Sequence, residues 1–188
     1  PIKQPPESLE SEELAKPETI VSQPSRGYIH AYWAQAKSVL LHPRSFFEMM
    51  PANVPAKEPF IFLAISALIY AFLQALVKFN FVIRFPPFST TLVTVPVGAM
   101  VAFYAFKKLG GKGTMLDTFR VFSYSKATLL FAWFAAGPYA IGGGLALVYT
   151  VYLNIIGCMK VHGLPKKITS LLIIILAIIG MLLRARMP

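Results

Sequence analysis

The sequence predicts an all-α, polytopic integral membrane protein with five transmembrane helices preceded by amphipathic interfacial helices. Hydrophobic residues make up 56% of the chain, charged residues only 14%, and the mean hydropathy is +0.61, outside the usual range of soluble domains. After Glu58 the chain contains one acidic residue, Asp117. Five apolar stretches surround it, each close to the about 20 residues that cross ~30 Å of hydrocarbon. They are residues 60–78, 88–106, 119–136, 140–159 and 168–183.

The net charge of +10 does not indicate nucleic-acid binding, because the basic residues lie at the ends of the apolar stretches. Basic residues in that position meet anionic lipid headgroups and set membrane topology. We therefore expect membrane lipids, and no nucleic acid, as partners. The one cysteine, Cys158, excludes an internal disulfide and a cysteine-rich metal cluster. The first residues lack a basic region followed by an apolar run, so we expect no secretory signal peptide.

Residues 1–27 form the first predicted region, an extended polar N-terminal tail. Residues 1–24 contain five prolines and few large apolar side chains, so this segment cannot bury enough surface to fold alone. Such a segment becomes ordered by lying on another protein, and we expect it to contact other membrane protein subunits. Its acidic residues are Glu7, Glu10, Glu12, Glu13 and Glu18.

Residues 28–59 are predicted to form amphipathic interfacial helices. In residues 28–41, helical spacing places Ile29, Trp33, Ala36 and Leu40 on one face. A second short helix can begin at Pro43, whose missing N–H costs nothing in a first turn. It would bury its aromatic residues either in the membrane surface or on the helical bundle. The expected interfacial anchors are Trp33, Phe46 and Phe47.

Residues 60–188 are predicted to form the five-span domain, and the basic residues predict its orientation. Ten of them flank the sides that we assign to the cytoplasm, against four on the opposite side. The positive-inside rule then gives a cytoplasmic N-terminus and a C-terminus outside. The third span is the weakest prediction, because it contains Ser123, Ser125 and Lys126. The cytoplasmic set is Arg26, Lys37, Arg44, Lys57, Lys107, Lys108, Lys112, Lys160, Lys166 and Lys167, joined by Arg120 at the start of the third span, and the opposite set is Lys78, Arg84, Arg184 and Arg186.

The loop before the third span predicts a capped helix. Thr114 stands three residues before Asp117, the spacing of a capping box at the positive end of the helix dipole. Gly113 separates Lys112 from Thr114, whereas a phosphate-binding loop requires Gly-Lys followed directly by Ser or Thr. We therefore expect a helix cap and no nucleotide cofactor.

Lys126 is the candidate for an intramembrane polar site. If the third helix starts near Met115 and ends at the Gly137-Pro138 turn, Lys126 stands about eleven residues from each end, ~16 Å deep at 1.5 Å per residue. A charge at that depth faces the bundle interior or extends along its stem to the interface. The short turn at residues 137–139 makes spans three and four an antiparallel hairpin, which brings Tyr149, Thr150 and Asn154 near Lys126. Either a structural polar contact or a functional site is consistent with this pattern.

Four segments together resemble the Yip family, the Ypt-interacting membrane proteins, and specifically its bacterial members. The resemblance covers residues 32–183 and implies five helices, a cytoplasmic N-terminal region, a C-terminus outside the cytosol and a bacterial inner (cytoplasmic) membrane location. Eukaryotic members are associated with Rab-type GTPases and vesicle traffic. The segments are WAQAKSVLLHPRSFFEMM (33–50), LGGKGTMLDTFRVFSYSKA (109–127), the Gly137-Pro138 turn and IIGCMKVHGLPKKITSLLI (155–173).

The function expected first is non-catalytic: a structural or accessory subunit that binds a larger membrane protein assembly. No acidic residue lies within a predicted span, since Asp117 stands just before the third, and His30, His42 and His162 are far apart in sequence. This pattern does not support an enzyme, a metal site or another cofactor site. One alternative is a small transporter or channel with a polar path near Lys126. Another is a membrane-trafficking or membrane-organising adaptor of the Yip type.

Overall fold

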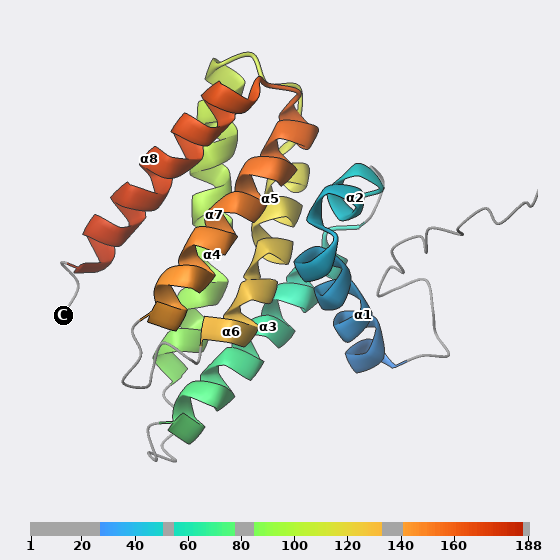
Figure 1. Cartoon of the computed structure of the whole chain (residues 1–188), viewed down its shortest axis with the longest axis vertical. Coiled ribbons are helices and arrows are strands. Elements are labelled where there is room, and N and C mark those ends of the chain that lie inside the picture. Colours follow the sequence, from blue (N-terminus) through green and yellow to red (C-terminus); the bar gives the residue numbers. More distant parts are fainter. Residues whose placement is uncertain (1–26, 51–54, 78–84, 133–140, 186–188) are drawn as a thin grey trace, which may run out of the picture.

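A computed structural model describes residues 27–50, 55–77, 85–132 and 141–185, and every regular element within them is helical (Figure 1). Two helices precede the bundle, and the rest of the chain builds it. The preceding helices are α1 (Tyr28–Leu41) and α2 (Pro43–Glu48). The bundle contains α3 (Lys57–Val77), α4 (Phe85–Lys108), α5 (Met115–Tyr124), the 3-10 helix η1 (Ser125–Thr128), α6 (Leu129–Ala132), α7 (Ile141–His162) and α8 (Lys166–Ala185).

The chain passes along the bundle in alternating directions. In Figure 1, α3 runs downward, α4 upward, the α5–η1–α6 series downward, α7 upward and α8 downward. The loop between α4 and α5 and the loop between α7 and α8 therefore lie at the same end. A hydrogen bond from the Lys112 backbone N–H to the His162 carbonyl, 3.1 Å long, joins the two loops there.

Three helices of the described chain are long and apolar enough to cross a membrane by length and composition. They include Lys57–Leu76, Phe88–Lys108 and Gly144–His162, which correspond to the first, second and fourth predicted spans. The chain is thus an all-α protein, in its described part, with three candidate membrane spans.

The third predicted span, residues 119–136, differs from the expectation of one continuous apolar helix. Its described part is divided among α5, η1 and α6. The reason is its position: α5 contacts α3, α4 and α7, so it is the central element of the bundle. A helix surrounded by protein can carry polar residues that a lipid-facing helix cannot. Its buried polar residues are Thr118, Arg120, Ser123, Ser125 and Thr128.

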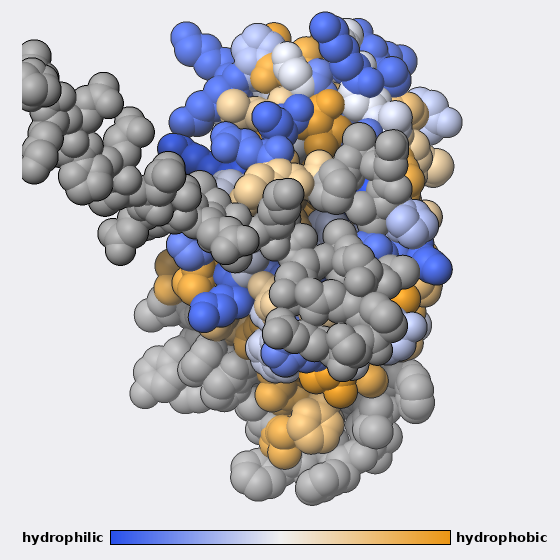
Figure 2. Space-filling view, turned by 90° about the vertical axis from the view of Figure 1, so that its right-hand side faces the viewer, coloured by the Kyte–Doolittle hydropathy of each residue, from blue (hydrophilic) through white to orange (hydrophobic). Residues whose placement is uncertain are grey.

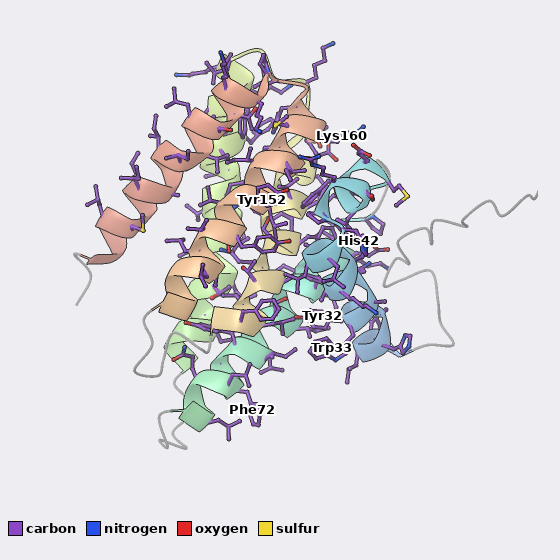
Figure 3. The ribbon with its side chains drawn as sticks, viewed as in Figure 1. Tyr32, Trp33, His42, Phe72, Tyr152 and Lys160 are labelled. Atoms are coloured by element: carbon purple, nitrogen blue, oxygen red, sulfur yellow. The ribbon has the colours of Figure 1, made fainter. Side chains whose placement is uncertain are left out.

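The α1 helix has the expected bounds but turns a different face to the protein. The buried face contains Tyr32, Gln35, Ala36 and Val39, whereas Ile29 and Trp33 are exposed. The predicted apolar face at Ile29, Trp33, Ala36 and Leu40 is therefore only partly the packed face. Tyr32 points to α3, and Trp33 lies beside it near the start of α1 (Figure 3).

Two of the expected interfacial anchors are core residues. Phe46 is 3% exposed and Phe47 is 1% exposed. The Phe46 ring packs edge-on against Tyr124 of α5, with 5.2 Å between ring centroids. Both aromatic residues of α2 therefore take the bundle position that the sequence left open, because α2 packs against α7 and α1. Of the three named anchors, only Trp33, at 51% exposure, presents its ring outward.

The polar tail falls almost entirely on residues 1–26, which lie outside the described residues, as does the turn at residues 137–139. The tail's contacts therefore remain a prediction.

Candidate functional site

The central polar feature is a seam between η1 and α7, formed by Ser125, Thr128, Thr150 and Asn154. Ser125 Oγ lies 2.8 Å from Asn154 Oδ1, and Thr128 Oγ1 lies 2.6 Å from Thr150 Oγ1. Ser125 is fully buried, and Thr128 and Asn154 are buried as well. Burying a hydrogen-bonded polar group costs far less free energy than burying one without a partner. The two pairs therefore lower the cost of burying these polar side chains between the helices.

The same hydroxyl groups explain why the helix tightens at η1. Ser125 Oγ donates to the Val121 carbonyl at 2.7 Å, and Thr128 Oγ1 donates to the Ser125 carbonyl at 2.9 Å. Thr150 Oγ1 donates to the Ala146 carbonyl at 2.8 Å. Such side chain to backbone bonds compete with regular helical bonds, and short 3-10 segments arise where they do. Because each hydroxyl has one proton, the Thr128–Thr150 contact replaces one of these carbonyl bonds, and the Ser125 proton is shared between the Val121 carbonyl and Asn154 Oδ1.

The predicted site at Lys126, Tyr149, Thr150 and Asn154 is divided in the structure. Thr150 and Asn154 bond to Thr128 and Ser125 in the seam. Tyr149 points elsewhere: its hydroxyl donates to the Leu40 carbonyl of α1 at 2.6 Å. Lys126 itself is half-buried in η1. The other three residues thus each have a hydrogen-bond partner on another element, η1 or α1.

From this arrangement we expect Lys126→Met to insert, fold and assemble normally. The change keeps the length of the stem and leaves the bonds of Tyr149, Thr150 and Asn154 in place. Replacing a partly buried charge by an apolar isostere is often neutral or stabilising, so the stability should change by less than about 1 kcal/mol. The measurement is the melting temperature in mild detergent together with membrane abundance. A mutant that inserts but does not join its complex would show that the amine has a binding role.

Two hydrogen bonds between described residues help to attach the α1 helix to the bundle. One is the Tyr149–Leu40 bond, and the other joins the Tyr32 hydroxyl to Ser66 Oγ of α3 at 3.1 Å. The Tyr32 ring also packs on Phe62, with 4.8 Å between centroids. Burial raises the pKa of the Tyr32 hydroxyl, and its hydrogen bond with Ser66 lowers that pKa in part. The hydroxyl therefore stays protonated and available for this bond at physiological pH.

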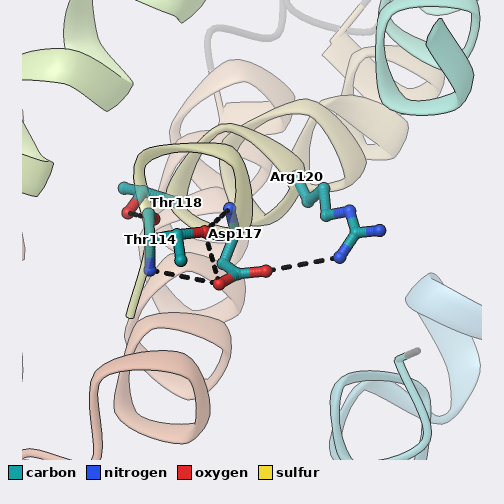
Figure 4. A network of polar contacts seen from close by, with 4 residues as sticks. All are labelled: Thr114, Asp117, Thr118 and Arg120. Atoms are coloured by element: carbon teal, nitrogen blue, oxygen red, sulfur yellow. Dashed lines mark hydrogen bonds and ion pairs between the residues drawn. The ribbon is translucent and has the colours of Figure 1, made fainter. Parts of the chain in front are cut away.

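Thr114 and Asp117 form a capping box at the start of α5 (Figure 4). The Asp117 backbone N–H donates to Thr114 Oγ1 at 3.2 Å, and the Thr114 backbone N–H donates to Asp117 Oδ2 at 3.1 Å. The Thr114 hydroxyl also donates to Oδ2 at 2.6 Å. These bonds satisfy donors that the first turn of a helix otherwise leaves open. The carboxylate at this end of α5 therefore has a structural role.

Arg120 is a buried charged residue that the sequence analysis did not place in the core. It was counted only as a topology signal, yet it is 1% exposed and is the largest fully buried side chain of the described core. Its Nη1 donates to Asp117 Oδ1 at 3.3 Å (Figure 4). Glu58, at the start of α3, is also buried. The spacing of Asp117 and Arg120 at i and i+3 on a helix is the sequence signal that could have indicated the pair.

The sequence analysis also did not predict that His162, at the end of α7, is buried. Its ring stacks on Phe106 with 4.4 Å between centroids, and its Nε2 lies 3.0 Å from Thr118 Oγ1. Thr118 donates its hydroxyl proton to the Thr114 carbonyl, at 2.9 Å, so Nε2–H is the donor to Thr118. His162 Nδ1 has no hydrogen-bond partner among the described residues. His162 thus ties α7 to α4 and α5 as a neutral ring.

Two glycines of the α4–α5 loop make room for His162. A Cβ at Gly111 or at Gly113 would lie 2.9 Å from His162 Nδ1, too close for a real contact. Gly111 and Gly113 are therefore explained by close packing of this loop on α7, and Gly110 by its φ of 85°, so the glycines do not indicate phosphate binding. That spacing of glycines was the only sequence signal for the contact.

Comparison with known proteins identifies the family. Residues 37–185 match the Yip1 domain, and the match includes the polar seam, the capping box, Arg120 and His162. The chain belongs to the Yip1 domain family. No curated protein and no solved structure matches the chain.

Family membership gives the chain a coarse function. Yip1 domain proteins are membrane proteins related to membrane traffic and Rab interaction, and they are generally non-catalytic. Within the described parts of this Yip1 domain, no group of three or more His, Cys, Asp or Glu side chains is placed to hold a metal ion. Cys158 is a free thiol that is fully buried on α7.

Proposed function

We propose that this chain is a non-catalytic, membrane-organising adaptor of the Yip type, which holds membrane-bound protein partners through its cytoplasmic surface. The observation that carries the proposal is the Yip1 domain match, which extends over the whole described bundle from the second half of α1 to the end of α8. This family supports an adaptor better than the accessory subunit that composition alone suggested. In either role the protein acts by binding.

The buried polar groups favour an adaptor over a transporter. A polar path through the bundle would need groups free to exchange partners with a solute. Thr150 and Asn154 instead bond to Thr128 and Ser125, and Tyr149 bonds to the α1 backbone. These contacts fix helices to one another, which suits a rigid binding platform.

We also propose that the adaptor crosses the membrane five times. The support is the alternating direction of α3, α4, α5–η1–α6, α7 and α8 (Figure 1). The α8 helix has 20 residues and no charged residue between Lys167 and Arg184, so it is ~30 Å long and apolar. The third pass, α5–η1–α6, crosses the membrane in the interior of the helical bundle. In this arrangement the protein lies in the bacterial inner membrane. Its N-terminus is cytoplasmic and its C-terminus is outside the cytoplasm.

The topology can be tested with one cysteine and one fusion. Lys112→Cys, in the exposed position between α4 and α5, should react with a membrane-impermeant maleimide only from the cytoplasmic side. Native Cys158 is fully buried and does not compete for the reagent. A reporter fused after Pro188 should be active only outside the cytoplasm. If position 112 and the C-terminus report the same side, the number of spans is not five.

The partner interaction can be tested at the N-terminal tail. Deleting residues 1–24 should leave membrane insertion intact but reduce the amount of protein partner that co-purifies in mild detergent. The physical reason is that a proline- and glutamate-rich segment gains order only on a partner surface, with part of its contact energy offset by ordering.

A matched control separates the effect of the tail's negative charge from the effect of its length on partner binding. In this control the tail keeps its length, and its five glutamates become glutamines. Loss of partner in both variants indicates electrostatic recognition, whereas loss only on deletion indicates apolar or backbone contacts. Unchanged co-purification of the truncated protein would contradict a binding role for the tail.

A further inference from the structure

Six exposed lysines gather at the end of the bundle where the α4–α5 and α7–α8 loops meet. The Lys112–His162 backbone bond places the two loops side by side. The hydrophilic surface at the upper end in Figure 2 and the position of Lys160 in Figure 3 show this gathering. The six, here called the basic end, are Lys107, Lys108, Lys112, Lys160, Lys166 and Lys167.

The described acidic residues do not neutralise the basic end. Asp117 bonds to Thr114 and to Arg120. Glu58 is buried at the start of α3, and Glu48 lies on α2, which packs against α1 and α7. The lysines therefore form a concentrated positive surface, and like charges so close together favour an anionic ligand.

Exposed apolar side chains lie next to these lysines on the same two helices. Tyr104 of α4 and Leu109 just after it flank Lys107 and Lys108. Ile168 and Leu171 follow Lys166 and Lys167 on α8, and α4 contacts α8. Lys107 also extends back over the Phe103 ring, with Nζ 5.9 Å from its centroid. Such a stem lies along an apolar surface while its amine stays at the polar boundary.

We propose that the basic end binds an anionic phospholipid at the junction of α4 and α8. The phosphate meets Lys108, Lys166 and Lys167, and the acyl chains lie along the apolar flanks at Tyr104 and Leu171, on the span side of the lysines. A soluble acidic protein matches the charge but not the adjoining hydrocarbon-facing residues, so a ligand with both parts fits this surface better. This lipid is a ligand of a defined place, in addition to the bulk bilayer around the spans.

The experiment is native mass spectrometry of the full chain in detergent, with phosphatidylglycerol or phosphatidylcholine added at equal concentration. Wild-type protein should retain phosphatidylglycerol preferentially, and sodium chloride should weaken that retention. Lys166→Gln with Lys167→Gln should reduce phosphatidylglycerol affinity about tenfold or more, from the contribution of each lysine near an anionic headgroup. Lys37→Gln with Lys57→Gln, two exposed lysines elsewhere, should change it less than about twofold.

A competition with glycerol 3-phosphate and a charge-conserving double variant complete the experiment. Glycerol 3-phosphate supplies the phosphate without acyl chains, and it should neither bind detectably nor compete with the lipid. Lys166→Arg with Lys167→Arg keeps the charge and should keep the affinity, which covers the case in which the glutamine variant does not fold. Equal retention of the two lipids, equal effects of the two glutamine pairs, or competition by glycerol 3-phosphate would overturn the proposal.

Discussion

Arg120→Met is expected to destabilise the protein by about 2 to 4 kcal/mol, the largest effect of any single charge removal in the bundle. The Arg120 side chain is 1% exposed, and its guanidinium lies 3.3 Å from the Asp117 carboxylate. Removing one partner of a buried ion pair leaves the other charge uncompensated, at a cost of about 3 to 5 kcal/mol when both are fully buried. Asp117 is 22% exposed, so water offsets part of that cost.

The matched control for Arg120→Met is Lys126→Met on the same pass of the chain. Both changes replace a basic side chain by the same apolar one, but Lys126 is only half-buried. Melting temperatures in detergent should fall for Arg120→Met and stay near wild type for Lys126→Met. Adding Asp117→Asn to Arg120→Met should restore part of the loss, because the remaining charge is removed and the amide oxygen can still accept the capping bonds. Equal melting temperatures for the two methionine variants would show that burial of Arg120 does not decide its energetic role.

Gly157→Ala is expected to destabilise the bundle by about 1 to 3 kcal/mol, the usual cost of overpacking a core. Gly157 lies where α7 crosses α5 and α2. A Cβ there would come 2.5 Å from Val121 Cγ1, 2.9 Å from Val121 Cγ2 and 3.1 Å from Phe47 Cε1. Both methyls of Val121 are close, and Val121 is fully buried, so a rotamer change alone does not clear the space.

Gly144→Ala on the same helix is the control for this prediction. No atom lies within 4 Å of a Cβ built at Gly144, so this change should be neutral or stabilising by up to about 1 kcal/mol through helix propensity. Combining Gly157→Ala with Val121→Ala should recover part of the stability, because the shortened side chain vacates the overlapped volume. The thermal unfolding of these three variants and of the wild type in detergent measures the effect. A Gly157→Ala variant as stable as Gly144→Ala would mean that α7 and α5 can separate without cost.

The helices could be located well from the sequence, because the length of an apolar stretch and the residues that begin and end a helix are local properties of the chain. The α1 bounds agree with the expected segment, and α3, α4, α7 and α8 each begin and end within about three residues of the predicted spans. The third span could not be predicted in the same way. Its polar residues argue against a lipid-facing helix, and only the packing of α3, α4 and α7 around it explains them.

The candidate site was predicted in part. Counting outward from the expected hairpin turn brought the right region of α7 to the third pass, since Thr150 and Asn154 do face it. The count selected Lys126 as their neighbour because a charge is the most conspicuous residue of the pass. The actual partners are Ser125 and Thr128, which the tightened turn of η1 directs to α7.

By itself the sequence determined the membrane class of this protein, the positions of its helices and the unequal numbers of basic residues at alternate span ends. These follow from hydropathy and charge summed along the chain, to which each residue contributes independently of the fold. The tertiary structure decided which polar residues are partners, that Phe46 and Phe47 lie in the core, and that Arg120 and His162 are buried. Those outcomes depend on contacts between segments far apart in the chain, and a side chain is buried or exposed only by what the rest of the fold places against it.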